Sequence, residues 1–250
     1  MKEKTRIDVY LVEKGLAPSR NKAQELIRKG LVSVRTRHGE RPILQSSELD
    51  YDGDVVVRPD PLIRYVSRGG VKLESALKQV QLDVRSFRIL DVGMSTGGFS
   101  DCLLQAGASL SVGIEVGHGQ LSPRLLADPR VYCLEGVNAR HLQGETRFLD
   151  VLPKGGFDLA VVDVSFVSLS YVLPPIQAYT RRTLALVKPQ FEVGPDHLVN
   201  GIVRDEKLFA LVEKKIRDLC SLIGKRVDAY FPSSIEGKDG NKEFFVFLDK

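Results

Sequence analysis

Cysteine is scarce in this 250-residue sequence, and its spacing excludes two kinds of protein. The three cysteines are odd in number and lack the spacing of metal ligands, which argues against both a disulfide framework and a zinc site. They are Cys102, Cys133 and Cys220. The four histidines show no ligand spacing either, so no metal site is predicted.

Long apolar runs are also missing. The first ten residues, MKEKTRIDVY, carry charges where a signal peptide has its apolar segment. The longest uncharged stretch, VSFVSLSYVLPPIQAYT, is interrupted by two prolines and is a poor membrane span. With 43% apolar and 27% charged residues, the composition is that of a globular protein. We therefore expect a cytoplasmic protein with neither a membrane contact nor an obligate protein partner.

Positive charge is abundant only at the N-terminal side. Residues 1–41 contain eleven Lys and Arg against five Asp and Glu, a net charge of +6, whereas the whole chain carries +4. The remaining residues therefore carry −2. This distribution is typical of a basic nucleic-acid-binding module joined to a nearly neutral body.

The first 60 residues predict a small module of helices and strands. In RIDVYLVEKGLAPSRNKAQELIRKGLVSV, Gly15 ends one helix and Ser19 caps a second, and short strands follow. Basic residues on a helix most often only face solvent, but the local net charge here favours phosphate contacts. The candidate RNA-binding residues are Arg6, Arg20, Lys22, Arg28, Lys29, Arg35, Arg37 and Arg64.

The pattern R-I-D-x-x-L followed by GLAPSRNKAQELIRKGLVSV resembles the S4 RNA-binding domain. This resemblance implies binding to structured RNA by shape and backbone. One departure is the longer and more basic turn RTRHG after the first strand of the module. Residues 61–67, next to two prolines, read as a linker to a second domain at 68–250.

Beyond the linker, short β-rich and helical segments alternate. Such alternation predicts an α/β fold with a mostly parallel sheet and helices on both faces. ILDVGMSTGGFSD, residues 89–101, reads as a strand, a tight turn and a helix. Its glycine spacing fits neither the dinucleotide fingerprint nor a P-loop. An acid followed by a glycine-rich turn suits S-adenosylmethionine, although the glycines could also only close a tight connection.

Polar residues end the predicted strands in order. Asp91, Glu115, Asp163 and Lys188 each stand at a strand end, where ligands gather in a parallel sheet. Glu115 is in the position of an acid that accepts hydrogen bonds from a ribose diol, and Asn138 is a candidate for contact with adenine. Each could alone be a cap or turn former, but their succession favours a nucleotide-like cofactor.

The residues after the fourth strand of this domain bear on the methyl acceptor. Asp-Val-Ser-Phe at 163–166 lacks the two prolines typical of methylation at a base amino group, and no cysteine follows a proline as in C5-pyrimidine enzymes. A hydroxyl acceptor remains, and a ribose hydroxyl requires a base. A lysine whose pKa is lowered by burial or by a second cation can serve, and Lys188 in LALVKPQ is the candidate.

Lys72, Asp163, Lys188 and Glu243 match a Lys-Asp-Lys-Glu set, which resembles that of the FtsJ-like RNA ribose 2′-O-methyltransferases. Almost end to end, the chain resembles the TlyA (hemolysin A) family of S4-linked rRNA methyltransferases. The resemblance is carried by SRGGVKLE, LDVGMSTGGFSDCLLQAGA, GHGQL, DPRV, NARHL, VVDVSFVSL, LVKPQFEVG and NKEFFVFL.

The resemblance implies a Rossmann-like class I S-adenosylmethionine-dependent methyltransferase with a seven-stranded sheet. Its substrate would be rRNA, at a cytidine 2′-hydroxyl in assembled ribosomal subunits, and Lys188 would be the base. The implied cofactor residues are Asp91, Gly93, Ser95, Gly97, Gly98, Phe99, Glu115, Asn138 and Asp163. At Glu115 the family usually has aspartate.

Three alternatives were weighed against this interpretation. The sequence offers no support for a pore-forming protein. A pseudouridine synthase would need a catalytic aspartate in a Gly-Arg-Leu/Ile-Asp motif, and the nearest analogue here, SRGGVKLE, lacks that aspartate. A catalytically silent RNA-binding protein with a methyltransferase fold remains open, because a fold does not establish activity.

Overall fold

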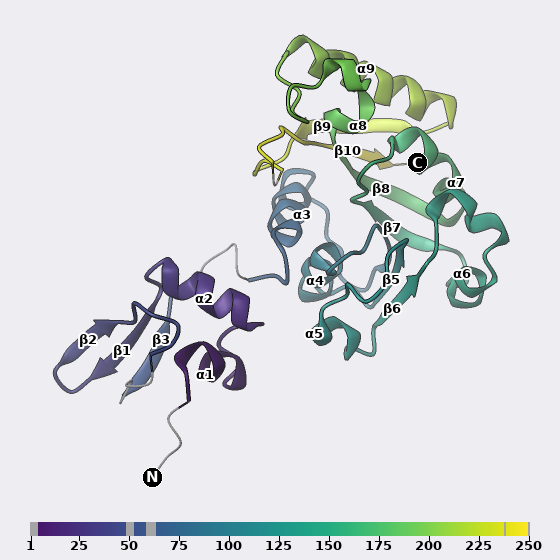
Figure 1. The fold of residues 1–250 in the computed structure, drawn as a ribbon. Helices are drawn as coiled ribbons and strands as arrows, with labels where there is room; N and C mark the ends of the chain where they lie inside the picture. The colour runs from purple at the N-terminus through teal and green to yellow at the C-terminus, as the bar shows by residue number, and fades with distance from the viewer. Residues whose placement is uncertain (1–4, 49–52, 59–63, 238, 250) are drawn as a thin grey trace. The chain divides into compact units, whose positions relative to one another are not determined.

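The computed structural model describes residues 5–48, 53–58, 64–237 and 239–249, in two compact units, residues 1–71 and 72–250 (Figure 1). The predicted domain limits stay predictions. Within the predicted linker, positions 61–63 lie outside the described residues.

The N-terminal unit combines two helices with a small antiparallel sheet. Its elements are α1 (Ile7–Glu13), α2 (Arg20–Arg28), β1 (Val32–Thr36), β2 (Gly39–Pro42) and β3 (Asp54–Val57). The strand order is β2-β1-β3. The predicted cap is confirmed, since Ser19 Oγ accepts a hydrogen bond from the Lys22 backbone N–H at 3.3 Å. The apolar faces of the two helices pack against β1, with Ile7, Leu26 and Val32 buried. These contacts give the unit its own core.

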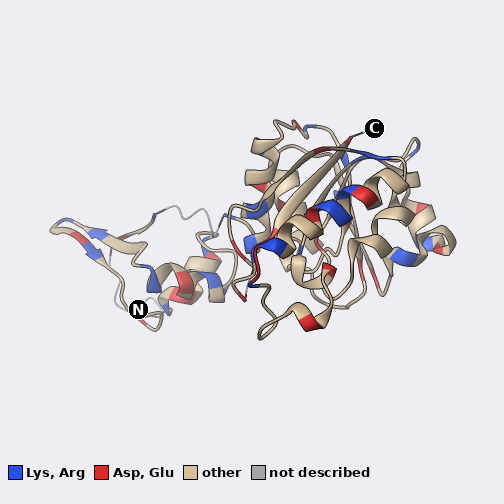
Figure 2. Ribbon diagram, turned by 90° about the horizontal axis from the view of Figure 1, so that it is seen from above, with Lys and Arg blue, Asp and Glu red and all other residues tan. Residues whose placement is uncertain are grey.

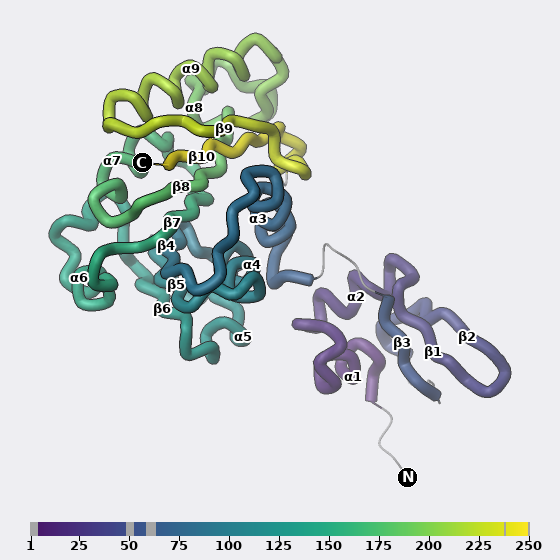
Figure 3. The backbone as a smooth tube through the Cα atoms, turned by 180° about the vertical axis from the view of Figure 1, so that it is seen from behind, coloured from purple at the N-terminus to yellow at the C-terminus, as the bar shows by residue number. Residues whose placement is uncertain are grey.

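The second unit is built on a seven-stranded sheet. Its strands are β4 (Arg88–Val92), β5 (Leu110–Glu115), β6 (Val131–Glu135), β7 (Phe157–Val162), β8 (Thr180–Val187), β9 (Arg226–Pro232) and β10 (Phe244–Asp249). The order is β6-β5-β4-β7-β8-β10-β9, and β10 runs antiparallel to both of its neighbours, β8 and β9, whereas the pairs from β6 to β8 are parallel. Figure 3 follows the same strands from behind. The predicted mostly parallel sheet is confirmed.

Helices cover both faces of this sheet. They are α3 (Arg68–Gln79), α4 (Gly98–Gln105), α5 (Pro123–Leu126), α6 (Thr146–Val151), α7 (Leu173–Ile176), α8 (Pro189–Glu192) and α9 (Lys207–Leu222), with four short 3₁₀ turns. Phe99 of α4 stacks on Phe245 at 6.3 Å, whereas the preceding Phe244 meets Phe209 of α9 at 5.5 Å. Because neighbouring side chains of a strand point to opposite faces, α4 and α9 lie on opposite sides. Within the described ranges, no helix is long and apolar enough to cross a membrane.

One helix begins earlier than the sequence predicts. The sequence SRGGVKLESALKQV predicts a helix that starts at Lys72, after two glycines, but α3 begins at Arg68. A Cβ on Gly70 would lie 2.4 Å from Tyr65 Cγ, so this glycine allows a close approach of the buried tyrosine ring. Here the glycines accommodate packing within the helix and do not end it.

Candidate active site

A cavity of about 600 Å³ opens where the carboxyl ends of β4, β5 and β7 meet. Val92, Ile114 and Val137 form part of its apolar wall, and Glu115 and Asp163 add carboxylates. A cavity of this size and mixed lining suits a nucleotide-sized organic ligand.

The turn after β4 is shaped by a glycine and an acid. Gly93 has φ +83°, and a Cβ there would fall 2.4 Å from the Asp163 carbonyl oxygen. Glu115 accepts hydrogen bonds from the backbone N–H groups of Ser95, at 2.9 Å, and Gly117, at 2.8 Å. A carboxylate has further lone pairs, so Glu115 can hold the turn and still accept from a diol.

Asp91 lies beneath the cavity. Its side chain is fully buried, and Oδ2 accepts from the Ser100 backbone N–H at 3.1 Å and from Ser100 Oγ at 2.6 Å. Oδ1 has no hydrogen-bond partner among the described residues. Burial raises the pKa of Asp91 to about 7 despite the Ser100 hydrogen bonds, and the nearby charges of Asp163 and Glu115 act in the same direction. Asp91 therefore supports the turn in a form that is easily protonated.

The other predicted cofactor residues divide between wall and support. Asn138 lines the cavity, where its Oδ1 accepts from the Arg140 backbone N–H at 3.1 Å. Gly97, with φ +89°, precedes α4, and Gly98 is its first residue. Phe99 is buried against Phe245, so it packs α4 on the sheet. The sequence does not distinguish these packing positions from the wall itself.

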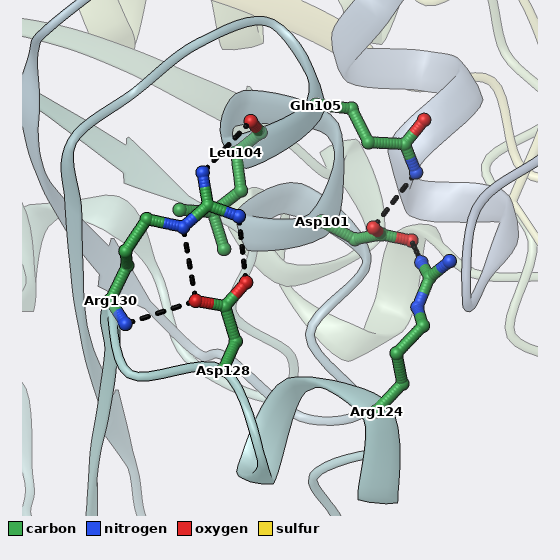
Figure 4. Close-up of polar contacts among 6 residues, drawn as sticks. All are labelled: Asp101, Leu104, Gln105, Arg124, Asp128 and Arg130. Carbon is green, nitrogen blue, oxygen red and sulfur yellow. Dashed lines mark hydrogen bonds and ion pairs between the residues drawn. The ribbon is translucent and has the colours of Figure 1, made fainter.

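Polar contacts anchor α5 to α4 beside the cavity (Figure 4). The buried carboxylate of Asp101 accepts from Gln105 Nε2 at 2.9 Å and pairs with Arg124. Arg130 pairs with Asp128 at 2.7 Å and reaches the Leu104 carbonyl oxygen at 3.5 Å. These contacts hold the segment that follows the Gln120 wall of the cavity.

The predicted catalytic residues form two ion pairs. Lys188 Nζ lies 2.6 Å from Asp163 Oδ1 and donates to Ser165 Oγ at 3.0 Å. Lys72 of α3 pairs with Glu243, and both side chains are buried. The structure therefore joins lysine to carboxylate in both halves of the predicted set.

Strand register brings the two pairs to one place. Phe244, the first residue of β10, pairs with Val187, the last residue of β8. Glu243 and Lys188 are the next residues beyond this pair and so stand opposite each other. Asp163 follows β7, the other neighbour of β8. Because β10 is antiparallel, Glu243 at its start lies at the same edge of the sheet as the C-terminal ends of β7 and β8.

Several residues of the cavity were missed by the sequence analysis. Ser165 binds Lys188, and Gln120 and Arg140 line the wall. Phe166 is 91% exposed at the cavity with φ +63°, in the left-handed region that only a few non-glycine residues adopt. All four lie in the motifs GHGQL, NARHL and VVDVSFVSL, each of which stands at or shortly after the end of a strand, and that position was their signal in the sequence.

Two of the candidate RNA-binding residues surround a buried acid. Asp8 accepts from Arg6 Nε at 3.1 Å, Arg20 at 3.3 Å and Gln24 at 2.9 Å. Burial by itself would raise the pKa of Asp8, but these hydrogen bonds outweigh it and lower that pKa to about 2. Arg6 and Arg20 therefore also serve the fold of the N-terminal unit.

The remaining basic candidates differ in their partners. Figure 2 shows acidic and basic positions interleaved on this unit. Lys22 and Lys29 both pair with Glu25, at 2.8 and 3.2 Å, and Arg35 lies 3.7 Å from Glu40. Arg64 stacks over Tyr65 at 5.2 Å. Arg28 and Arg37 are exposed and form no ion pair with a described residue, which leaves them the most available for phosphates.

The cysteines lie in surroundings that suppress their reactivity. Burial raises the pKa of the Cys133 and Cys220 thiols to about 11, so both are protonated near neutral pH. Over the described ranges, no group of three or more His, Cys, Asp and Glu side chains is placed to hold a metal ion.

Comparison with known proteins agrees with this geometry. The model of the FtsJ-like methyltransferase family matches residues 65–250, and that of the S4 domain matches residues 5–34. The 16S/23S rRNA (cytidine-2′-O)-methyltransferase TlyA of Mycobacterium tuberculosis is 38% identical over 99% of this chain and 91% of its own. Hemolysin A of Brachyspira hyodysenteriae is 36% identical over 96% of this chain and 98% of its own.

Solved structures show the same fold. A hemolysin from Streptococcus thermophilus superposes with a TM-score of 0.72 at 36% identity, over 99% of this chain and 88% of its own. An S-adenosylmethionine-dependent methyltransferase from Mesorhizobium loti shares the fold alone, at 14% identity and a TM-score of 0.50, over 72% of this chain and 98% of its own. These structures confirm the predicted fold class, and the match to the FtsJ-like methyltransferase family confirms S-adenosylmethionine as the cofactor. The chain belongs to the FtsJ-like methyltransferase family, together with the TlyA and hemolysin A proteins, and it carries an S4 domain on its N-terminal side.

Proposed function

We propose that this protein methylates the ribose 2′-hydroxyl of a cytidine in rRNA, within assembled ribosomal subunits, with Lys188 as the general base. The observation that carries the proposal is the Lys188–Asp163 pair, whose carboxylate lines the cavity, with the Lys72–Glu243 pair beside it in the register of β8 and β10. The named activity of the Mycobacterium tuberculosis relative supports the choice of acceptor.

The cavity suits S-adenosylmethionine. Glu115, held toward the turn by two backbone N–H groups, can accept from a ribose diol, and the apolar wall of Val92, Ile114 and Val137 can pack on a purine. The carboxylates at the cavity match the positive charge of the ligand. When bound, S-adenosylmethionine supplies the methyl group from a sulfonium.

Lys188 would take the proton that the acceptor loses. As the 2′-oxygen bonds to the methyl carbon and the carbon–sulfur bond breaks, the hydroxyl proton passes to Lys188 Nζ. Asp163 stands 2.6 Å away and stabilises the ammonium that this transfer creates. Glu243 balances the charge of Lys72 beside it. An ammonium cannot act as a base, so Lys188 gives up a proton to solvent before the transfer. Its contacts with Asp163 and Ser165 are present before any substrate arrives, so the base is oriented in advance.

The test is methyl transfer to unmodified ribosomal subunits from labelled S-adenosylmethionine, followed by digestion of the RNA to nucleosides. Wild-type protein should place label on 2′-O-methylcytidine, and Lys188→Ala should lose at least about a hundredfold in rate. Lys214→Ala is the matched control, because Lys214 lies on the exposed side of α9 and pairs with Asp218. It should behave as wild type.

Other outcomes lead to different conclusions. Label on a base would refute the 2′-hydroxyl acceptor while retaining the cofactor. Full activity in Lys188→Ala would refute the role of this lysine. Cofactor binding without transfer to either subunit, or to free rRNA, would favour a silent RNA-binding protein.

A further inference from the structure

Glu192, the last residue of α8, forms a buried polar junction behind the proposed active site. Its side chain is 1% exposed, and its carboxylate accepts from Ser168 Oγ at 2.6 Å and from the Leu169 backbone N–H at 2.8 Å. Lys215 Nζ of α9 lies 2.9 Å from the carboxylate and also donates to the Glu192 carbonyl oxygen at 2.8 Å. One carboxylate thus joins three segments of the chain.

Two of these segments carry the proposed catalytic contact. Ser168 and Leu169 end the loop that begins at Asp163 and includes Ser165, whereas α8 begins directly after Lys188. Glu192 therefore binds the two segments together a few residues from where Lys188 meets its two partners. Phe166 and Phe191 make a second contact between the same loop and α8, with ring centroids 5.2 Å apart.

The energetics favour a role for the hydrogen bonds more than for the ion pair. Lys215 is 45% exposed, and a lysine that reaches water contributes little through its charge alone. The bonds from Ser168 and Leu169 are buried or partly buried, and burying a carboxylate is costly unless donors surround it. Because Ser168 and Leu169 both donate to the buried Glu192 carboxylate, they restrict the conformation of the loop of residues 163–169.

We infer that Glu192 is a positioning residue for methyl transfer. It fixes the loop of residues 163–169 so that Asp163 and Ser165 stay in contact with Lys188. The inference rests on the proposed function, in which Lys188 is the base. Ser168 Oγ and the Leu169 N–H bind different oxygens of the carboxylate, and Lys215 Nζ shares the oxygen that Ser168 binds. Glu192→Gln replaces one of these oxygens by an NH2 group, which cannot accept and would face either the Leu169 N–H or the Lys215 ammonium.

The first test separates the rate from cofactor binding. Glu192→Gln should lower the single-turnover methylation rate about tenfold or more, with the Kd for S-adenosylmethionine within about threefold of wild type, because misplacement of reacting groups acts on the rate. Glu213→Gln, which changes an exposed glutamate of α9, should alter neither the rate nor the Kd.

A double-mutant cycle separates positioning from general destabilisation. Ser168→Ala removes the bond to Glu192 and the contacts of Ser168 Oγ with Ser170 but no charge, so it should fold and lower the rate less. Combined with Glu192→Gln it should add little, since both act on one junction. A folded Glu192→Gln with the wild-type rate, or with rate and cofactor affinity lost in parallel, would overturn the inference.

Hydrogen exchange tests the junction without the reaction. Backbone amides of residues 164–169 should exchange faster in both Glu192→Gln and Ser168→Ala than in wild type, and unchanged exchange would also overturn the inference. Wild-type protein that binds cofactor but transfers no methyl group would count against the proposed function, whereas this exchange measurement would still decide whether Glu192 holds the loop.

Discussion

Replacing Asp91 by asparagine should remove much of the pH dependence of the stability of the methyltransferase unit. Its pKa is raised to about 7 in the folded protein from 3.8, chiefly by burial. Between these values the folded state holds a proton that the unfolded state has lost. The native state therefore binds more protons there, and stability falls as pH rises toward 7.

The magnitude follows from proton linkage. The slope is about 1.4 kcal/mol per pH unit where the two states differ by one proton, and it levels off above pH 7. The free energy of unfolding should thus fall by about 2.5 kcal/mol between pH 5 and pH 8 through Asp91 alone. Asparagine can accept from the Ser100 backbone N–H and carries no charge, so the variant should lose this contribution.

The assay is urea unfolding of both proteins, without cofactor, at pH 5, 6, 7 and 8. Subtracting the variant from the wild type removes the contributions of the histidines, which both proteins share. Asp218→Asn, at an exposed ion pair on α9, is the control and should show no pH-dependent difference. A difference between wild type and Asp91→Asn that stays constant within about 0.5 kcal/mol from pH 5 to 8 would refute the reasoning.

Three further predictions concern the N-terminal unit and the turn that follows β4 at Gly93. Asp8→Asn should lower the free energy of unfolding of the N-terminal unit by about 2 kcal/mol at neutral pH, measured in urea. The stabilisation that Asp8 gives the wild type is complete above pH 3.8 and should disappear as the pH falls through 2. Arg28→Ala with Arg37→Ala should reduce the slope of log K against log salt for RNA binding by about 2 and leave cofactor affinity unchanged in titrations. Gly93→Ala should weaken cofactor binding at least about tenfold by calorimetry, because its Cβ would overlap a backbone carbonyl, whereas Gly144→Ala, with open space around it, should not.

Residues at strand ends were the most predictable part of this protein. Asp163 and Lys188 follow strands whose apolar character is evident in the sequence, and parallel strands necessarily bring their carboxyl ends to one edge. Glu115 was likewise predictable as an acid at the cavity. The fold class followed from the alternation of elements for the same reason.

Side-chain partners from distant segments were not predictable. Nothing in FEVG indicates that Glu192 is buried, because its partners come from the distant segments that carry Ser168, Leu169 and Lys215. Phe99 directly follows the glycines of the turn, which suggested a cofactor contact. It packs on Phe245 instead, because the side of α4 that carries Phe99 faces the sheet. The sequence predicts Arg20 as an exposed cation, because its ion pair with Asp8 depends on how α1 and α2 pack.

The position of β10 has a consequence for how the protein is made. Lys72 and Glu243 are 171 residues apart, and β10 is inserted between β8 and β9. During translation, the cavity-forming strands β4 to β8 all leave the ribosome well before Glu243 is added to the chain. A nascent protein thus acquires the parts of the cavity first and the full set of proposed catalytic residues only once Glu243 and β10 have been made. Termination of synthesis before residue 243 would yield a chain with the cavity-lining residues but an incomplete proton-transfer network.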